Sequence, residues 1–220
     1  MDFLAESPGD VEGVKRYARA LGGSILIPSE HAMTSLVGQA YLELSADEHI
    51  NVDVLWKLIG IDARRVFARS VEVTMGAAAF RVMHPLDVLR SRLLNIHELA
   101  DKQNEKGEMQ LRLAIDVARE FLREEAAKHP EALATGRSPI QVLVSEIEKL
   151  AVEDAGRKVA SRHGVHVADA IDPSLIPAGM FWTKRWPALQ GLMSPEYGER
   201  FAPPDLDGEG PPVRLRPTGG

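Results

Sequence analysis

Alternating apolar and polar residues predict β-strands in the first part of the chain. In residues 39–44 and 49–56 every second side chain is apolar, and the stronger series consists of Ile50, Val52, Val54 and Trp56. A period of two is typical of a strand with one buried face. Shorter apolar runs predict further strands at residues 1–5, 24–28, 70–75 and 79–83.

Apolar residues at helical spacing predict helices between these strands. After the turn around Pro8 and Gly9, such residues recur at Val11, Val14, Ala18 and Leu21. This spacing predicts an amphipathic helix that ends at Gly22, because glycine readily adopts the left-handed conformation that follows a helix. Residues 62–68 are predicted to form a second, shorter helix.

From His84 onwards the pattern is helical. Pro85 suits the first turn of a helix. Three apolar series at helical spacing follow it: Leu86, Leu89, Leu93 and Ile96; Leu111, Ile115, Ala118 and Leu122; and Ile140, Leu143, Val144, Ile147 and Leu150. Each series predicts one helix with a buried face.

Capping residues predict where the third of these helices begins and ends. Ser138 is the expected N-cap, followed by Pro139 as the first helical residue. The helix is expected to run to Gly164, with a break at Gly156. Residues 181–192 are predicted to form a shorter helical segment, which aromatic side chains fasten to the core.

Strands followed by helices predict an α+β fold rather than a doubly wound α/β fold. The expected parts are a mixed β-sheet with flanking helices in residues 1–84, a helical bundle in residues 85–195 and a tail in residues 196–220. Five Pro and four Gly occur among the last 20 residues. This composition buries too little apolar surface to offset the entropy of ordering, so we expect the tail to be disordered.

Composition narrows the class of protein. The 220 residues are 45% hydrophobic and 26% charged, as in ordinary globular proteins, and the net charge of −6 disfavours a general nucleic-acid binder. Cysteine is absent, which excludes disulfides, thiolate metal sites and cysteine nucleophiles. No apolar run reaches the roughly 20 residues that cross a bilayer, and the acidic N-terminus is unlike a signal peptide. We therefore expect a cytoplasmic protein that binds no membrane.

Two acidic residues are the main candidates for chemistry. Asp53 is expected on the face of its strand opposite Val52 and Val54, and Asp2 precedes Phe3 in another short strand. Carboxylates on adjacent strands lie about 5–8 Å apart, close enough to share a divalent ion with substrate phosphates. Two surface aspartates at strand ends are the alternative interpretation.

The order of these segments resembles a known superfamily. Four features carry the resemblance. In chain order they are an acid before Phe3 and Leu4, a helix, the run Ile-Asn-Val-Asp-Val-Leu at residues 50–55, and the run Phe-Arg-Val-Met-His-Pro at residues 80–85. They resemble bacterial nucleotidyltransferase-fold proteins of the DNA polymerase β superfamily, which are related to the abortive-infection nucleotidyltransferase toxins of toxin–antitoxin pairs. The resemblance implies that Asp2 is the second acid of a metal-binding Asp-x-Asp pair. It also implies that Asp53 is the third acid, which binds metal and helps to activate the nucleophile.

This resemblance implies an enzyme that uses Mg²⁺ or Mn²⁺. Its substrate would be an NTP, and the nucleotide would be transferred to a hydroxyl group of a protein, a small molecule or an RNA. Arg81, Arg92 and Lys102 are the candidate ligands of the triphosphate, because cationic side chains bind phosphate oxygens.

Two parts of the superfamily pattern are missing. The first acid of the pair would precede Met1, and the Gly-Ser turn would lie further upstream. Residues 22–24, Gly-Gly-Ser, do not replace this turn, because they follow a helix whereas phosphate binding requires a helix N-terminus. Either Met1 is internal to a longer chain, or the protein is a degenerate member. In both cases we expect the 220-residue form to transfer nucleotides poorly, and a catalytically inactive relative that acts as a protein-interaction module is the alternative function.

One other group of residues resembles a metal-ligand set. His163, His166 and Asp169 lie close together in the sequence. His163 is better explained as a cation near a helix C-terminus, where it interacts favourably with the helix dipole. We therefore expect no metal at this position.

Overall fold

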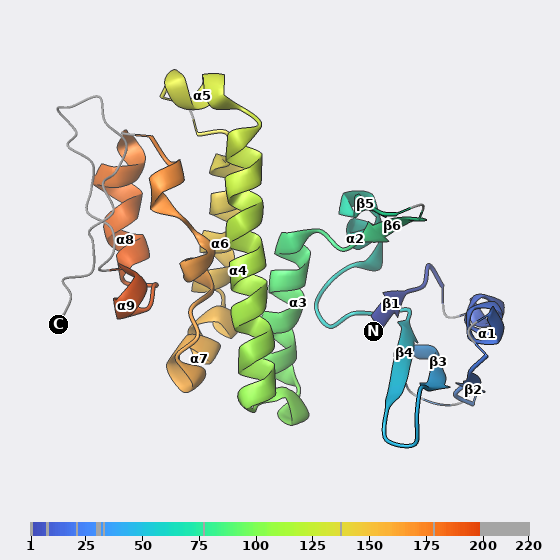
Figure 1. The fold of residues 1–220 in the computed structure, drawn as a ribbon. Helices are drawn as coiled ribbons and strands as arrows, with labels where there is room; N and C mark the ends of the chain where they lie inside the picture. Colours follow the sequence, from blue (N-terminus) through green and yellow to red (C-terminus); the bar gives the residue numbers. More distant parts are fainter. Residues whose placement is uncertain are drawn as a thin grey trace. The chain divides into compact units, whose positions relative to one another are not determined.

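The computed structural model describes residues 2–7, 9–20, 22–29, 32, 34–76, 78–136, 138–177 and 179–198. The chain divides into two compact units between His84 and Pro85, and each unit is described by itself. Within the described residues, the first unit contains two β-sheets with two helices, and the second contains only helices (Figure 1). The predicted sequence of strands followed by helices is confirmed.

Four strands form the main sheet of the first unit. They are β1 (Asp2–Leu4), β2 (Ser24–Leu26), β3 (Leu36–Glu43) and β4 (His49–Leu55). Their order across the sheet is β1-β4-β3-β2, with β1 parallel to β4 and the other neighbouring pairs antiparallel. The sheet is therefore mixed, and its first strand in sequence lies next to its last.

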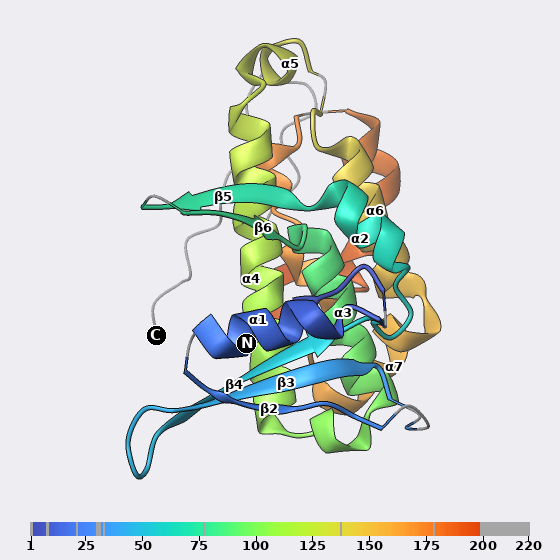
Figure 2. The same ribbon diagram turned by 90° about the vertical axis from the view of Figure 1, so that its right-hand side faces the viewer.

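Helix α1 (Val11–Ala20) packs on one face of this sheet (Figure 2). Ala18 of α1 is buried against Ala40 of β3 and Val52 of β4, and Val14, one helical turn earlier, belongs to a second buried cluster. Alternate residues of a strand point to opposite faces. Asp53, next to Val52, therefore lies on the face that α1 does not cover.

A helix and a hairpin complete the first unit. Helix α2 (Ala63–Arg69) begins after its N-cap Asp62, whose carboxylate accepts a hydrogen bond from the backbone N–H of Arg64 at 2.9 Å. Strands β5 (Val71–Met75) and β6 (Ala78–Val82) form a separate antiparallel sheet.

Three helices provide about half of the buried core of the second unit: α3 (Pro85–Glu98), α4 (Glu105–Ala127) and α6 (Gln141–Val152). Helices α3 and α4 lie side by side in both views (Figures 1 and 2). The three predicted apolar series are buried between these helices, except for Leu143, which is half-buried. Burial of one Leu or Ile side chain contributes about 1.5–3 kcal/mol, so these series are a large favourable contribution to the folding of this unit.

The third predicted helix begins later than expected. The N-cap of α6 is Ile140, which provides no side-chain hydrogen bond, and Ser138 lies outside the helix. A short helix, α5 (Pro130–Ala134), precedes this segment. The N-cap prediction for Ser138 was wrong because the chain makes an additional turn, in which the N–H of Gln141 donates to the carbonyl of Ser138.

The break in the predicted third helix lies at Glu153 rather than at Gly156. Glu153 is extended, with φ −61° and ψ 158°, and it separates α6 from α7 (Asp154–His163). Gly156 has a different role, because a Cβ atom there would lie 2.1 Å from the carbonyl oxygen of Leu150. Gly164, with a φ of 61°, ends α7 as predicted.

Aromatic side chains anchor the C-terminal helical segment as predicted. A π-helical turn, Phe181–Arg185, continues into α8 (Trp186–Gln190). The N–H of Trp186 donates to the carbonyl of Phe181, five residues earlier, next to Pro187, which has no N–H to donate. The rings of Trp182 and Trp186 are both buried, with centroids 5.1 Å apart.

The tail prediction fails for its first three residues. Residues 196–198 belong to α9 (Pro195–Gly198), where Tyr197 is buried and its hydroxyl donates to the carbonyl of Ile171 at 3.1 Å. A buried aromatic ring offsets the ordering entropy that the composition of the tail suggested. The rest of the predicted tail, residues 199–220, lies outside the described residues. Among the helices that are described, none is both long enough and apolar enough to cross a membrane.

Candidate functional site

The two predicted metal ligands occupy paired positions on neighbouring strands. Asp2 of β1 and Asp53 of β4 are register partners in the parallel pair, followed by Phe3 with Val54 and Leu4 with Leu55. Positions that are separated by 51 residues in the sequence are thus adjacent in the sheet. The pairing results from the mixed topology, because a hairpin alone could not make β1 and β4 parallel.

A neighbouring amide holds the carboxylate of Asp53. The side-chain Nε2 of Gln39 donates to Oδ1 of Asp53 at 2.6 Å, and the two residues are register partners in β3 and β4. Asp53 is half-buried. The hydrogen bond limits the rotamers of this carboxylate, so the direction of its second oxygen is also restricted.

The donor set on the sheet is small. In the part of the chain that the structure describes, no group of three or more His, Cys, Asp or Glu side chains could hold a metal ion. Mg²⁺ is commonly bound by one or two carboxylates, with substrate phosphates and water as the other ligands. Whether an ion can be held at these two strand positions together with substrate phosphates is taken up with the proposed function.

The predicted phosphate ligands are distributed over both units. Arg81 lies in β6, outside the main sheet, and its guanidinium donates to the carbonyl of Phe67 at 3.1 Å. Arg92 is a half-buried residue of α3, and Lys102 lies in a short turn after α3, with its ammonium 3.3 Å from the carboxylate of Asp101. Of the three cations, Arg81 is the one that shares a unit with Asp53.

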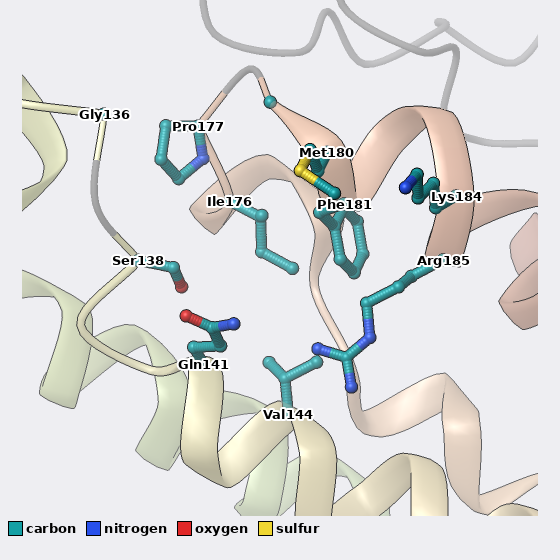
Figure 3. Close-up of a pocket in the computed structure, with 11 residues that line it drawn as sticks. Gly136, Ser138, Gln141, Val144, Ile176, Pro177, Met180, Phe181, Lys184 and Arg185 are labelled. Atoms are coloured by element: carbon teal, nitrogen blue, oxygen red, sulfur yellow. The ribbon is translucent and has the colours of Figure 1, made fainter.

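The second unit contains a pocket that sequence reasoning did not find. Its volume is about 400 Å³, and it lies between the start of α6 and the π-helical turn (Figure 3). Apolar side chains form much of its wall: Val144, Ile176, Pro177, Met180 and Phe181. Ser138, Gln141, Lys184 and Arg185 add polar groups to it. These residues come from segments about 40 residues apart, so no local sequence pattern indicated them.

One of the two cations of the pocket is already paired. The guanidinium of Arg185 lies 2.5 Å from Oε2 of Glu148 and 3.1 Å from Oγ of Ser145, both on α6. Burial raises the pKa of Glu148, against the opposing effect of Arg185. The charge of Arg185 is therefore engaged in holding the π-helical turn on α6.

No family model, no curated protein and no solved structure matches this chain. The chemistry of the described residues is therefore the basis of the functional assignment.

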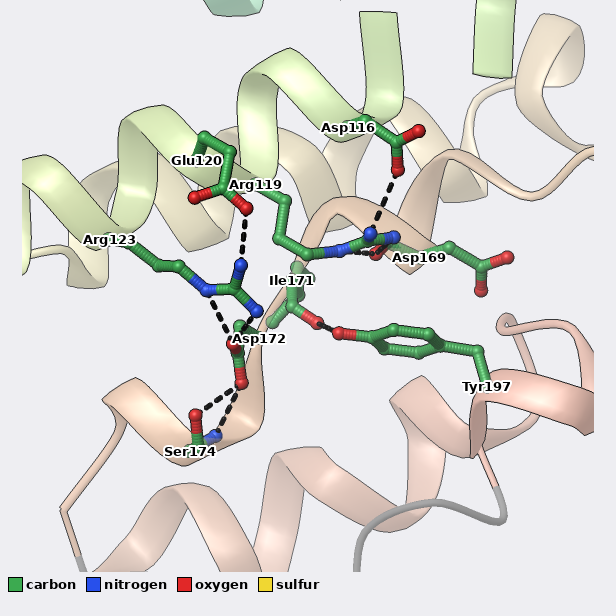
Figure 4. A network of polar contacts seen from close by, with 9 residues as sticks. All are labelled: Asp116, Arg119, Glu120, Arg123, Asp169, Ile171, Asp172, Ser174 and Tyr197. Carbon is green, nitrogen blue, oxygen red and sulfur yellow. Dashed lines mark hydrogen bonds and ion pairs between the residues drawn. The ribbon is translucent and has the colours of Figure 1, made fainter. Parts of the chain in front are cut away.

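A network of polar contacts joins α4 to the C-terminal segments (Figure 4). Arg119 donates to the carbonyl of Asp169 through Nε at 3.0 Å and Nη2 at 2.6 Å, and its guanidinium lies 4.8 Å from the ring centroid of Tyr197. Burial raises the pKa of Tyr197 to about 12. This tyrosine stays neutral at physiological pH, and its hydroxyl donates to the carbonyl of Ile171, so the network ties α4 to the segments around Asp169 and Tyr197.

The histidine group at the end of α7 makes protein contacts. Nδ1 of His163 lies 2.9 Å from the carboxylate of Glu108, and Asp169 accepts hydrogen bonds from the N–H and the hydroxyl of Ser194 at 3.0 and 2.8 Å. Burial raises the pKa of Asp169, although the bonds from Ser194 oppose the shift. Nδ1 of His166, the third residue of the set, lies 3.3 Å from the carbonyl oxygen of Leu192.

Proposed function

We propose that this chain is a nucleotidyltransferase-like protein whose main sheet binds an NTP together with Mg²⁺ or Mn²⁺ at Asp2 and Asp53. The observation that supports the proposal is the register pairing of these two residues in parallel neighbouring strands. The resemblance of the sequence assigned the same two residues to the metal-binding acids. Phosphoryl-transfer enzymes bind Mg²⁺ through one or two carboxylates together with the substrate phosphates. Two acids at paired positions of neighbouring strands are compatible with this use.

The residues of the sheet would orient and hold the substrate. Asp53, with one oxygen fixed by Gln39, presents its carboxylate in a restricted direction, and it is also the group proposed to lie nearest to the attacking hydroxyl. The bound ion would supply neutralisation of charge on the phosphates. Arg81 is the proposed phosphate ligand from the same unit. The acceptor would be a hydroxyl group of a protein, a small molecule or an RNA.

Thermal unfolding with ATP, GTP, CTP or UTP and Mg²⁺ tests this proposal. At 100 times the Kd, a bound ligand stabilises the protein by about 2.7 kcal/mol. We expect a shift of this size for the unchanged chain and its loss in Asp53→Asn. Asp47→Asn is the matched control, because Asp47 is exposed in the turn between β3 and β4.

Two outcomes would contradict the proposal. One is the absence of a metal-dependent shift with any of the four nucleotides. The other is an equal shift in Asp53→Asn and in the unchanged chain. If the shift and its loss in Asp53→Asn are both observed, transfer of labelled nucleotide to the protein itself or to total RNA, measured with the same variants, tests for the acceptor; we expect this transfer to be slow in the 220-residue form.

A specific observation favours the second candidate function, a non-catalytic interaction module. Strand β2 is last in the order of the sheet, and its residues Ile25 and Leu26 are 36% and 57% exposed, followed by Ile27, which is 38% exposed. An exposed apolar edge strand is a common place for a partner protein to add a strand. If nucleotides leave the thermal stability unchanged and Leu26→Lys abolishes capture of a partner, this second function holds instead.

A further inference from the structure

We propose that the pocket of about 400 Å³ between α6 and the π-helical turn binds a small apolar molecule with a carboxylate at one end and a hydrogen-bonding group at the other. The ligand site lies within the second unit and does not depend on the proposed nucleotide site. A pocket of this volume is within the range of small-molecule sites, which runs from about 300 to 1,000 Å³.

The middle of the pocket is apolar. Ile176 and Phe181 lie between its two polar ends (Figure 3), and Val144 closes the side formed by α6. An aliphatic or aromatic body in contact with these side chains would be removed from water, which favours binding in proportion to the buried area.

One end of the pocket offers hydrogen bonds. The hydroxyl of Ser138 is shielded from solvent and has no hydrogen-bond partner among the described residues, and the amide of Gln141 lies beside it (Figure 3). A buried hydroxyl without a partner costs free energy. A ligand hydroxyl or carbonyl group at this end would satisfy it.

The other end is cationic. Lys184 is exposed, and its side-chain ammonium makes no hydrogen bond or ion pair with the other described residues. Arg185 beside it is neutralised by Glu148, so Lys184 supplies the net charge at this end. Across the pocket, the first turn of α6 has no side-chain cap, and its N–H groups add positive potential. An anionic ligand fits this field, and a cationic one does not.

Fluorescence titration with 1-anilinonaphthalene-8-sulfonate, an apolar anion, measures occupancy of this pocket. Displacement then uses two phenols of similar size, 3-(4-hydroxyphenyl)propionate and tyramine, of which one ends in a carboxylate and the other in an ammonium group. We expect the carboxylate to displace the probe and tyramine to leave it bound. Displacement by both compounds alike would overturn the charge assignment.

Variants locate the binding. Lys184→Glu should weaken binding of the fluorescent anion about tenfold or more, because a charge-assisted contact is lost and a repulsive one replaces it. Gln141→Trp should reduce binding by filling the pocket. Lys106→Glu is the matched control on an exposed residue of α4, and Asp53→Asn tests independence from the nucleotide site; both should bind as the unchanged chain does. Equal affinities in Lys184→Glu and Lys106→Glu, with native thermal unfolding in both, would refute the proposal.

Discussion

Arg123 donates two hydrogen bonds to one oxygen of Asp172, from Nε at 3.0 Å and from Nη2 at 2.8 Å. The side chain of Asp172 is 0% exposed, whereas that of Arg123 is 35% exposed. The other oxygen of Asp172 accepts from the N–H and the hydroxyl of Ser174 at 3.0 and 2.5 Å. A fully buried carboxylate is tolerated here because partners satisfy both of its oxygens.

Replacement of Arg123 should therefore destabilise the second unit. Arg123→Met leaves the charge of Asp172 buried with fewer partners. We expect a loss of about 2–3 kcal/mol in the free energy of unfolding. This loss is smaller than for a fully buried ion pair, because water reaches Arg123. Urea denaturation followed by tryptophan fluorescence measures it, since Trp182 and Trp186 are buried in the same unit.

Two further variants test this explanation. Arg112→Met, on the exposed side of the same helix, should change stability by less than about 0.5 kcal/mol. In the double variant Arg123→Met with Asp172→Leu, part of the lost stability should return, because no charge is left buried. If the double variant loses more unfolding free energy than Arg123→Met and Asp172→Leu lose in total as single variants, the buried charge is not the cause.

The same carboxylate predicts a dependence of stability on pH. Burial raises the pKa of Asp172, but the hydrogen bonds from Ser174 and Arg123 outweigh burial, so the pKa lies below its ordinary value. A lowered pKa means that the folded state binds this proton less readily than the unfolded state does. The stabilisation that Asp172 contributes is therefore fully present above its pKa in the unfolded state, about 3.9. It is lost as the pH falls through the lower pKa that Asp172 has in the folded state.

Comparison with Asp172→Asn isolates this contribution. The difference in unfolding free energy between the unchanged chain and the variant should be constant from pH 7 to about pH 5 and should shrink below about pH 4. Asp169, whose pKa is raised by burial, titrates in both proteins, so its effect cancels. A difference that stays constant down to pH 3 would contradict the lowered pKa.

The spacing of apolar residues along the chain predicted the helices and strands and which of their faces are buried. The apolar series Leu111, Ile115, Ala118 and Leu122 is buried, as its spacing indicated. The alternating series of β4 likewise placed Asp53 opposite Val52, which is buried under α1. Such patterns depend only on the period of the backbone and on which face is apolar.

Contacts between distant segments were not predictable in the same way. Arg123 and Asp172 are 49 residues apart, and the walls of the pocket come from α6 and from residues after Ile176. Ser138 shows the limit even for local signals. A serine before a proline favours an N-cap, but the chain makes one more turn here, and the fully buried Ile140 is the N-cap, so α6 starts two residues later than expected.

The hydrogen bond between Gln39 and Asp53 yields a prediction for the proposed nucleotide site. Gln39→Met keeps the length of the side chain and removes the donor, so the carboxylate of Asp53 loses its restraint. We expect the metal-dependent stabilisation by NTP to weaken about tenfold in apparent affinity without disappearing, because a lost hydrogen bond to a charged group costs about 1.5 kcal/mol.

A titration of Mg²⁺ at fixed NTP, followed by thermal unfolding, measures this change. Gln110→Met, on α4 in the second unit, is the control and should titrate as the unchanged chain does. An unchanged midpoint in Gln39→Met would show that this amide does not orient Asp53 for metal binding.

A close approach of backbone segments leaves no room for a side chain at Gly107 in α4. Gly107 lies in the first turn, where its N–H donates to the side chain of the N-cap Asn104 at 3.0 Å. A Cβ atom at this position would lie 1.9 Å from the carbonyl oxygen of Lys102. Helix propensity alone favours alanine by about 1 kcal/mol, but a clash with backbone forces the preceding turn to move.

We therefore expect Gly107→Ala to destabilise the protein by about 1–3 kcal/mol in urea denaturation, against its helix propensity. Gly191→Ala is the matched control: its added Cβ would meet nothing closer than the carbonyl of Ala188 at 3.5 Å, so stability should change by less than about 0.5 kcal/mol. A more stable Gly107→Ala would show that the turn containing Lys102 shifts freely.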